Sequence, residues 1–188
     1  EFRRVLFRSG SGKSTAVNLI PRFYDATEGE VLVDGVNVRD YRLEALRNKI
    51  GYVPQKAVLF KGTVKSNVAF GENGREEPSE EDVRRAVRIA QGADFVEQME
   101  GQYGAEVAQG GTNLSGGQKQ RLSIARAVCR RPEIYIFDDS FSALDYRTDR
   151  VLRSVLKKET AGVTTVIVAQ RIRSEEHTSE LQSRLHLV

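Results

Sequence analysis

The sequence predicts an α/β fold in which a mostly parallel, doubly wound β-sheet is flanked by helices. Three observations carry this prediction. Residues 10–15, GSGKST, form a glycine-rich segment that leads directly into an amphipathic helix. Residues 134–137 and 163–169 are continuous apolar runs rich in β-branched side chains, which is typical of central parallel strands. The stretch between these runs has one apolar helical face, so strand, helix and strand alternate as they do in α/β domains.

The first third of the chain is expected to form short elements in close succession. The first helix should close near Pro21, because proline cannot continue a helix. Asp34-Gly35 lies between alternating valines and predicts a two-residue hairpin turn. Residues 43–49 then predict a short helix, and residues 50–53 a short strand that stops at a proline.

The middle of the chain predicts two helices with serine at their start. Ser79 is followed three residues later by Asp82, an imperfect capping box. Residues 101–112 are rich in glycine and are expected to be a long connector. Ser115 begins the second helix, which Pro132 ends.

Composition narrows the class of protein. The 188 residues are 39% hydrophobic and 29% charged, the balance of a globular domain. The apolar runs are far shorter than the ~20 residues of a membrane helix, so no membrane span is predicted. Cys129 is the single cysteine, which excludes a disulfide framework and a multi-cysteine zinc site and favours a reducing compartment. The net charge of +3 is small, and the lysines and arginines are interspersed with aspartates and glutamates, so we expect no nucleic-acid partner.

Both termini look foreign to the rest of the chain. Residues 1–9, EFRRVLFRS, and residues 173–188, which begin RSEEHTSELQS, resemble translated sequencing adapters. We therefore expect residues 10–172 to be the natural segment, truncated at both ends. On this hypothesis the strand that should precede the glycine-rich segment is missing.

The glycine-rich segment matches most of a phosphate-binding loop, whose full pattern is G-x-x-x-x-G-K-[ST]. The first glycine of that pattern falls at Phe7, inside the adapter-like text. Backbone amides of such a loop converge on phosphate oxygens. The lysine would reach the terminal phosphates of a nucleotide, and the hydroxyl after it would bind Mg²⁺. The predicted ATP-binding residues are Gly10, Ser11, Gly12, Lys13, Ser14 and Thr15.

A second feature is the apolar run that ends in the carboxylate of Asp138. Nucleotide hydrolases hold Mg²⁺ with a carboxylate in this position. This pattern alone is weak evidence for a nucleotide hydrolase. The segment before it carries the stronger evidence.

Residues 114–118 read LSGGQ and are followed by KQR. Ser115 would cap a helix, and Gly116 and Gly117, which have no side chains, would leave its first backbone amides exposed. Exposed amides at a helix N-terminus can bind an anion. The string resembles the signature motif of the ATP-binding-cassette (ABC) ATPases and stands just before the carboxylate strand, as it does in that family. The residues assigned to the signature are Leu114, Ser115, Gly116, Gly117 and Gln118.

The resemblance implies a P-loop NTPase-like fold with ATP and Mg²⁺ bound, and a small helical subdomain over about residues 56–130 that carries the signature. Gln55 matches the family's Q-loop glutamine, a ligand of magnesium and water that faces the membrane domains, so the implied metal ligands are Ser14, Gln55 and Asp138. Residues 62–71 and 105–111 resemble exporter-type segments. The residues that match the D-loop, which communicates across the dimer, are Ser142, Ala143, Leu144 and Asp145.

Two residues depart from the family pattern. Asp139 stands where the family usually has the glutamate that activates the attacking water, and Gln170 stands where it has the switch histidine. The resemblance gives both a catalytic role, together with Gln55. The side chain of Asp139 is one methylene shorter than that of glutamate. The Gln170 amide can donate a hydrogen bond but, unlike histidine, cannot take up a proton. Together they resemble the degenerate half of heterodimeric multidrug or lipid exporters.

The function implied is ATP hydrolysis that powers export, by a domain at the cytoplasmic face of the cell membrane. Its partners would be transmembrane domains and a second nucleotide-binding domain that supplies the missing Glu and His. One alternative is a soluble ABC ATPase of DNA repair or translation, although the spacing from Gln55 to Leu114 leaves no room for a long arm insertion. The other alternative is a truncated reading frame with no function, and for this polypeptide alone we expect inactivity.

Overall fold

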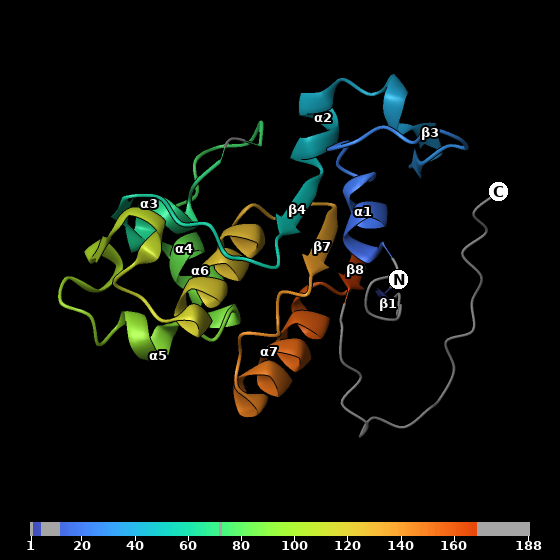
Figure 1. Ribbon diagram of the computed structural model, residues 1–188. Coiled ribbons are helices and arrows are strands. Elements are labelled where there is room, and N and C mark those ends of the chain that lie inside the picture. The colour runs from blue at the N-terminus through green and yellow to red at the C-terminus, as the bar shows by residue number, and fades with distance from the viewer. Residues whose placement is uncertain (1, 5–11, 72, 169–188) are drawn as a thin grey trace.

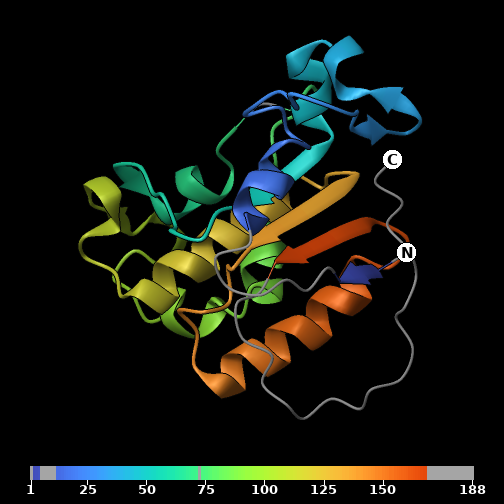
Figure 2. The ribbon, with the colours of Figure 1, turned by 45° about the vertical axis from the view of Figure 1, so that its right-hand side comes forward.

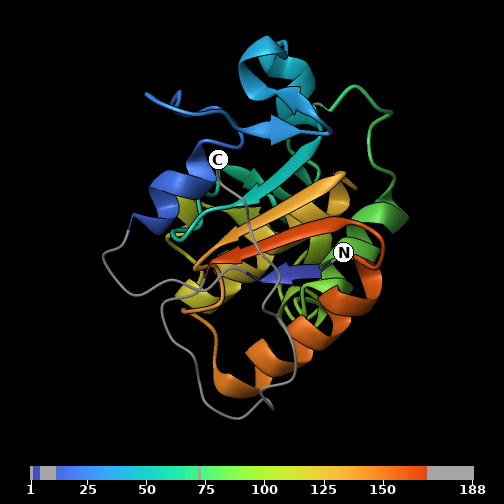
Figure 3. The same ribbon diagram turned by 90° about the vertical axis from the view of Figure 1, so that its right-hand side faces the viewer.

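The centre of the fold is a four-stranded parallel sheet with the strand order β1-β8-β7-β4. The computed structural model describes residues 2–4, 12–71 and 73–168 (Figure 1). The strands of the sheet are β1 Phe2–Arg4, β4 Ile50–Val53, β7 Ile134–Asp138 and β8 Thr164–Val168. They lie side by side in Figure 3, with β7 hydrogen-bonded to both β4 and β8. The predicted α/β fold with a parallel sheet is confirmed.

Helices cover both faces of the sheet, and the side chains of β7 alternate between them. Tyr135 and Phe137 pack on one face against α6 (Gly116–Cys129) and α7 (Tyr146–Glu159). Ile136 points to the other face and packs against α1 (Lys13–Asn18) and α2 (Leu43–Asn48). This alternation follows from the period of two in a strand, and because both faces are covered, β7 is an apolar run up to its last residue, Asp138. Figure 2 shows α7 below the sheet and α1 above it.

The expectation that no strand precedes the phosphate-binding loop is wrong. β1 pairs in parallel with β8, with Phe2 opposite Thr165 and Arg4 opposite Ile167. Strand pairing uses backbone N–H and C=O groups, so a segment of unusual side chains can still occupy the edge next to a buried strand. The resemblance of residues 1–9 to adapter text carries no information about backbone pairing. The adapter origin of the termini stays a prediction.

The short elements before β4 follow the sequence closely. β2 (Leu32–Val33) and β3 (Val36–Asn37) form the expected antiparallel hairpin. Both turn residues, Asp34 and Gly35, have positive φ, at 51° and 76°. Such a turn favours Asp-Gly because these residues tolerate the left-handed region. A 3₁₀ turn, η1 (Val38–Asp40), then leads to α2.

Four helices and a two-stranded antiparallel sheet fill the region between β4 and β7. The helices are α3 Val64–Val68, α4 Glu80–Ile89, α5 Ala93–Val96 and the long α6. The antiparallel pair β5 (Gly62–Thr63) and β6 (Glu106–Val107) ties the start of α3 to the glycine-rich connector, which also holds η2 (Gln102–Gly104) and η3 (Gln109–Gly111). None of the helices in the described ranges combines the length and the apolar character that crossing a membrane requires.

The serine starts of α4 and α6 are confirmed as capping boxes. Ser79 and Asp82 exchange two hydrogen bonds, of 3.0 and 3.2 Å, so the short aspartate completes the box after all. Ser115 and Gln118 do the same at 2.8 and 3.2 Å. Each box satisfies backbone groups that a helix start leaves unpaired.

Candidate functional site

The phosphate-binding loop meets α1 at Gly12, whose φ of 75° lies in the left-handed region that glycine adopts without strain. Lys13 and Ser14 open the helix, and Lys13 is buried although it is charged. Thr15 follows on the same helix and is exposed. Two of the predicted ATP-binding residues, Gly10 and Ser11, lie outside the described residues.

Ser14 and Asp138 come together from opposite ends of the chain. Ser14 Oγ donates a 3.0 Å hydrogen bond to Asp138 Oδ1 at the carboxyl end of β7. Asp138 is buried, with 5% of its surface exposed. The sequence predicted both residues as Mg²⁺ ligands, and the fold places their oxygens side by side.

These two oxygens fit the way Mg²⁺ binds in nucleotide sites, where one or two protein ligands combine with phosphates and water. The described part of the chain contains no cluster of three or more His, Cys, Asp or Glu that could hold a metal by itself. A magnesium ion held by Ser14 and Asp138 would therefore need the phosphates of a bound nucleotide as further ligands.

Gln55 and Asp139 meet at the same edge of the sheet. Gln55 follows β4, and its Nε2 donates a 3.1 Å hydrogen bond to Asp139 Oδ2. Asp139 follows β7 with a φ of 45°, in the left-handed region where aspartate is enriched. Its backbone N–H bonds to Val168 O at the end of β8. The third predicted catalytic residue, Gln170, lies outside the described residues.

Tyr52 is a member of the site that the sequence analysis did not predict. Its hydroxyl on β4 lies 3.0 Å from Asn18 Oδ1 and 3.4 Å from Asp138 Oδ2. Burial, and then the negative charge of Asp138, raise the pKa of Tyr52 to about 12. The hydroxyl therefore stays protonated at neutral pH and can donate a hydrogen bond.

The signature residues form a second group at the start of α6. Ser115 and Gly116 are exposed, whereas Leu114 is buried. A Cβ on Gly117 would lie 3.4 Å from the backbone oxygen of Ala143, so the signature packs directly against the predicted D-loop. Figures 1 and 2 show the first turn of α6 apart from α1. The fold brings Gly117 and Ala143 together, while the first turn of α6 lies apart from α1.

Ser142, in the predicted D-loop, links this second group to the first. Ser142 Oγ donates a 2.9 Å hydrogen bond to the carbonyl oxygen of Asp139. Asp145 caps α7 by accepting a 2.9 Å hydrogen bond from the backbone N–H of Thr148. The segment between Asp139 and α7 is therefore held at both ends.

A groove of about 270 Å³ lies beside β4, lined by Tyr52 among other residues, and Asp138 is not part of its lining. Phe23, Phe60 and Phe70 are 47%, 39% and 50% exposed, unusually high values for phenylalanine. We call this surface the aromatic–arginine groove; the residues that define it are Phe23, Tyr52, Phe60, Phe70, Arg47, Arg126 and Arg130.

Two arginines of the groove donate to neutral groups, whereas Nε of the third, Arg130, is buried without a hydrogen-bond partner among the described residues. Arg126 donates to the carbonyl oxygens of Val58 and Asn67, and burial lowers the pKa of its guanidinium to about 10. Arg47 donates to the carbonyl oxygens of Pro21 and Arg22. Within residues 12–71 and 73–168, no carboxylate lies within ion-pair distance of Arg47, Arg126 or Arg130.

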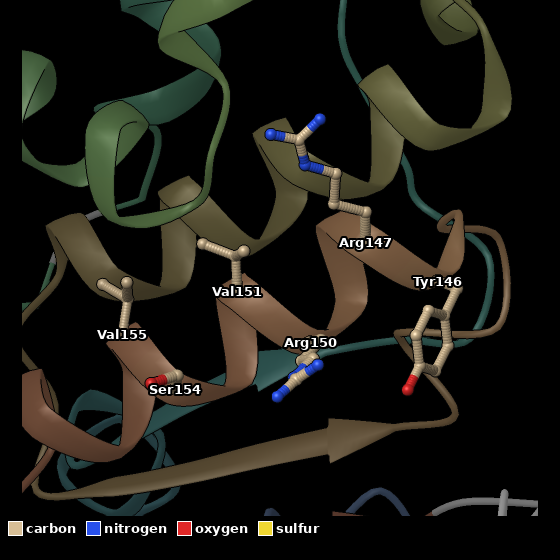
Figure 4. Close-up of a pocket in the computed structure, with 6 residues that line it drawn as sticks. All are labelled: Tyr146, Arg147, Arg150, Val151, Ser154 and Val155. Atoms are coloured by element: carbon tan, nitrogen blue, oxygen red, sulfur yellow. The ribbon is translucent and has the colours of Figure 1, made fainter.

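A further pocket of about 540 Å³ lies along α7 (Figure 4). Tyr146, Arg150 and Ser154 line one side of it at helical spacing, and Arg147, Val151 and Val155 line the other. None of the predicted site residues belongs to it.

Comparison with known proteins identifies the family. The model of the family described as "ABC transporter" matches residues 5–142. An uncharacterized ABC transporter ATP-binding protein of Mycobacterium tuberculosis is 49% identical over 168 residues, which are 89% of this chain and 28% of that protein. A Staphylococcus aureus protein, whose name describes a multidrug export ATP-binding/permease protein, is 43% identical over 92% of this chain and 29% of its own length.

A solved structure agrees with these relatives. The structure of a bacterial Atm1-family ABC exporter with ATP bound superimposes with a TM-score of 0.84 and 39% identity, over 90% of this chain and 30% of that one. The chain thus spans less than a third of the length of the proteins it matches. With the family model covering residues 5–142, the chain belongs to the ABC transporter family, as part of its ATP-binding domain.

Proposed function

We propose that the chain binds and hydrolyses ATP as the nucleotide-binding domain of an ABC exporter. The observation that carries the proposal is the 3.0 Å hydrogen bond between Ser14 and Asp138, beside the buried Lys13. A nucleoside triphosphate with Mg²⁺ fits this arrangement, because the site combines a buried lysine, a hydroxyl and a buried carboxylate at the end of a parallel strand. The names of the relatives, which include multidrug export, support the assignment to an exporter.

Each residue of the site has a role in this proposal. Lys13 neutralises the terminal phosphates, while Ser14 and Asp138 hold Mg²⁺, with Gln55 as a further ligand. The metal ion supplies charge stabilisation for the phosphoryl group. Asp139 orients the attacking water as a weak general base, and Gln170 donates a hydrogen bond to the terminal phosphate.

The first partner is a second nucleotide-binding domain, placed head to tail. The separation of residues 114–118 from α1 supports this arrangement, because the exposed Ser115 and Gly116 then face the phosphates bound by the other chain. The Asp139 site turns over slowly, so the partner is a different chain that supplies Glu and His at the competent site. We therefore propose a heterodimer.

The second partner is a membrane-spanning domain in the remainder of the polypeptide. The Staphylococcus aureus relative, of which this chain spans 29%, has a name that joins ATP-binding and permease. The aromatic–arginine groove suits such a partner, because its exposed rings would take an apolar segment and its arginines an acidic residue within that segment. The domain would then lie at the cytoplasmic face of the membrane, where ATP is available.

Steady-state ATP hydrolysis by the assembled pair tests the proposal. Ser115→Arg places bulk and charge where the partner's phosphate would dock, so it should nearly abolish turnover. Asp139→Asn should reduce turnover far less, because its own site contributes little. Equal damage from the two variants, or brisk hydrolysis by this chain paired with itself, would contradict the heterodimer with one slow site.

A further inference from the structure

We propose that Tyr52 is a positioning residue that links the aromatic–arginine groove to Asp138, so that a change in the groove alters Mg²⁺ binding at the phosphate site. The proposal rests on the proposed function, because it takes Asp138 as a ligand of Mg²⁺. Tyr52 is suited to this role because its ring and its hydroxyl belong to two different sites.

The hydroxyl end of Tyr52 lies within hydrogen-bonding distance of the Asp138 carboxylate. Asp138 Oδ1 already accepts the hydrogen bond from Ser14, and Oδ2 lies 3.4 Å from the Tyr52 hydroxyl. If Ser14 Oγ serves as a metal ligand, Tyr52 remains as the side-chain donor that orients Asp138. Donors of this kind fix the direction of a ligating carboxylate, and their removal typically weakens metal binding.

Asn18 offers the Tyr52 hydroxyl a second hydrogen-bond acceptor. A tyrosine hydroxyl has one proton, so it donates either to Asn18 Oδ1 at 3.0 Å or to Asp138 Oδ2 at 3.4 Å. The shorter distance favours Asn18 in this structure. Rotation of the O–H bond exchanges the two acceptors, and a tilt of the ring changes the two distances on which that choice depends.

The ring end of Tyr52 is held by the groove. Phe23 packs edge-on against it, with ring centroids 5.4 Å apart and an angle of 80° between the planes. The guanidinium of Arg47 lies 5.5 Å from the centroid of the Phe23 ring. Backbone pairing of β4 with β7 fixes the Cα of Tyr52 opposite Ile136, so the ring can respond to Phe23 mainly by tilting.

Binding of ATP to the full 188-residue chain, titrated with and without Mg²⁺, tests this link. Tyr52→Phe keeps the ring but removes the hydroxyl. We expect the Mg²⁺ concentration that gives half of the maximal Mg²⁺-dependent increase in ATP binding to rise about tenfold. The affinity for ATP in excess EDTA should stay unchanged, because Lys13 and the loop amides bind the phosphates without the metal. Tyr41→Phe is the matched control, since its hydroxyl bonds to Val33 O at 3.0 Å, in the hairpin.

The groove side is tested by Phe23→Ala, which removes the neighbour of the Tyr52 ring and no nucleotide ligand. We expect a smaller rise in the Mg²⁺ requirement, about threefold, in line with the energy of an aromatic pair. In the double variant, Phe23→Ala should add nothing to Tyr52→Phe, because both act through the same hydroxyl. Fully additive effects would overturn the link.

The remaining outcomes are distinguishable. An unchanged Mg²⁺ requirement in Tyr52→Phe, with Mg²⁺-ATP still bound by the unsubstituted chain, overturns the inference and leaves the proposed function standing. Equal loss of ATP binding with and without Mg²⁺ means that Tyr52 is merely structural and also overturns it. Failure of the unsubstituted chain to bind ATP overturns the proposed function together with this inference.

Discussion

Gln55 donates a 3.1 Å hydrogen bond to Asp139, joining the loop after β4 to the loop after β7 at the edge of the sheet. Asp139, which we propose as the shortened general base, therefore has its carboxylate engaged with the glutamine beside it. Its short side chain and its φ of 45° keep it close to the backbone of β7. This contact is the structural basis for expecting slow hydrolysis at this chain's own site.

Lengthening that side chain should increase hydrolysis. Asp139→Glu extends the carboxylate by about 1.5 Å, one C–C bond length. Since a misplacement of ~1 Å can cost ~10²-fold, we expect Mg²⁺-dependent phosphate release per chain to rise about tenfold or more. Asp149→Glu, at a carboxylate that pairs with Arg153 on α7, is the control and should leave the rate unchanged. A rate that does not respond to Asp139→Glu would mean that the side-chain length is not what limits turnover.

The capping boxes provide a prediction about stability. Ser115→Ala removes the acceptor for the backbone N–H of Gln118, and Ser79→Ala does the same at Asp82. Each should lower the free energy of unfolding by about 1 kcal/mol, as loss of a helix N-cap does. Denaturant titration measures both. Only Ser115→Ala should also slow ATP hydrolysis by the assembled pair. If Ser79→Ala slowed hydrolysis equally, the effect of Ser115→Ala could not be assigned to a role of Ser115 in the nucleotide site.

Gly51 tests the packing of β4 against the helical region. A Cβ at this position would lie 2.7 Å from Pro132 Cγ and 3.3 Å from the carbonyl oxygen of Ala127. We expect Gly51→Ala to lower the free energy of unfolding by about 1–3 kcal/mol, the usual effect of overpacking. Gly104→Ala is the control, because a Cβ there meets no atom within 4 Å. Similar melting temperatures for the two variants would show that β4 does not approach α6 so closely.

Local signals made much of the fold predictable. The strand over residues 50–53 and the hairpin turn at Asp34-Gly35 follow from patterns within a few residues. The helix starts at Ser79 and Ser115 are equally local, since a capping box spans four residues.

The features that sequence analysis missed depend on distant parts of the chain. β5 and β6 are two residues each and exist only because Thr63 pairs with Glu106. β1 depends on the free edge of β8, and no side-chain pattern marks it. Strand alternation assigns Tyr52 to one face of the sheet, but its contacts with Asn18 and Asp138 follow from how α1 packs across that face.

The roles of the predicted site residues stay predictions, but the positions of four of them can be compared with the structure. Ser14, Asp138, Gln55 and Asp139 were assigned from motifs, and the structure brings all four to one edge of the sheet. The motifs could not indicate which pairs would be in contact, because those distances depend on the packing of α1 and of the two loops.

Titration of ATP with Mg²⁺ against the unsubstituted chain and Lys13→Ala tests the central claim most directly. Lys13 is buried next to Ser14, and a charged contact to a phosphate contributes about 1.5–3 kcal/mol. We predict that Lys13→Ala weakens ATP binding by about 10- to 150-fold. Lys49→Ala, which removes a surface lysine paired with Asp34 and Glu133, should leave the affinity for ATP unchanged. Equal affinities of the unsubstituted chain and Lys13→Ala would contradict the assignment of this loop as the nucleotide site.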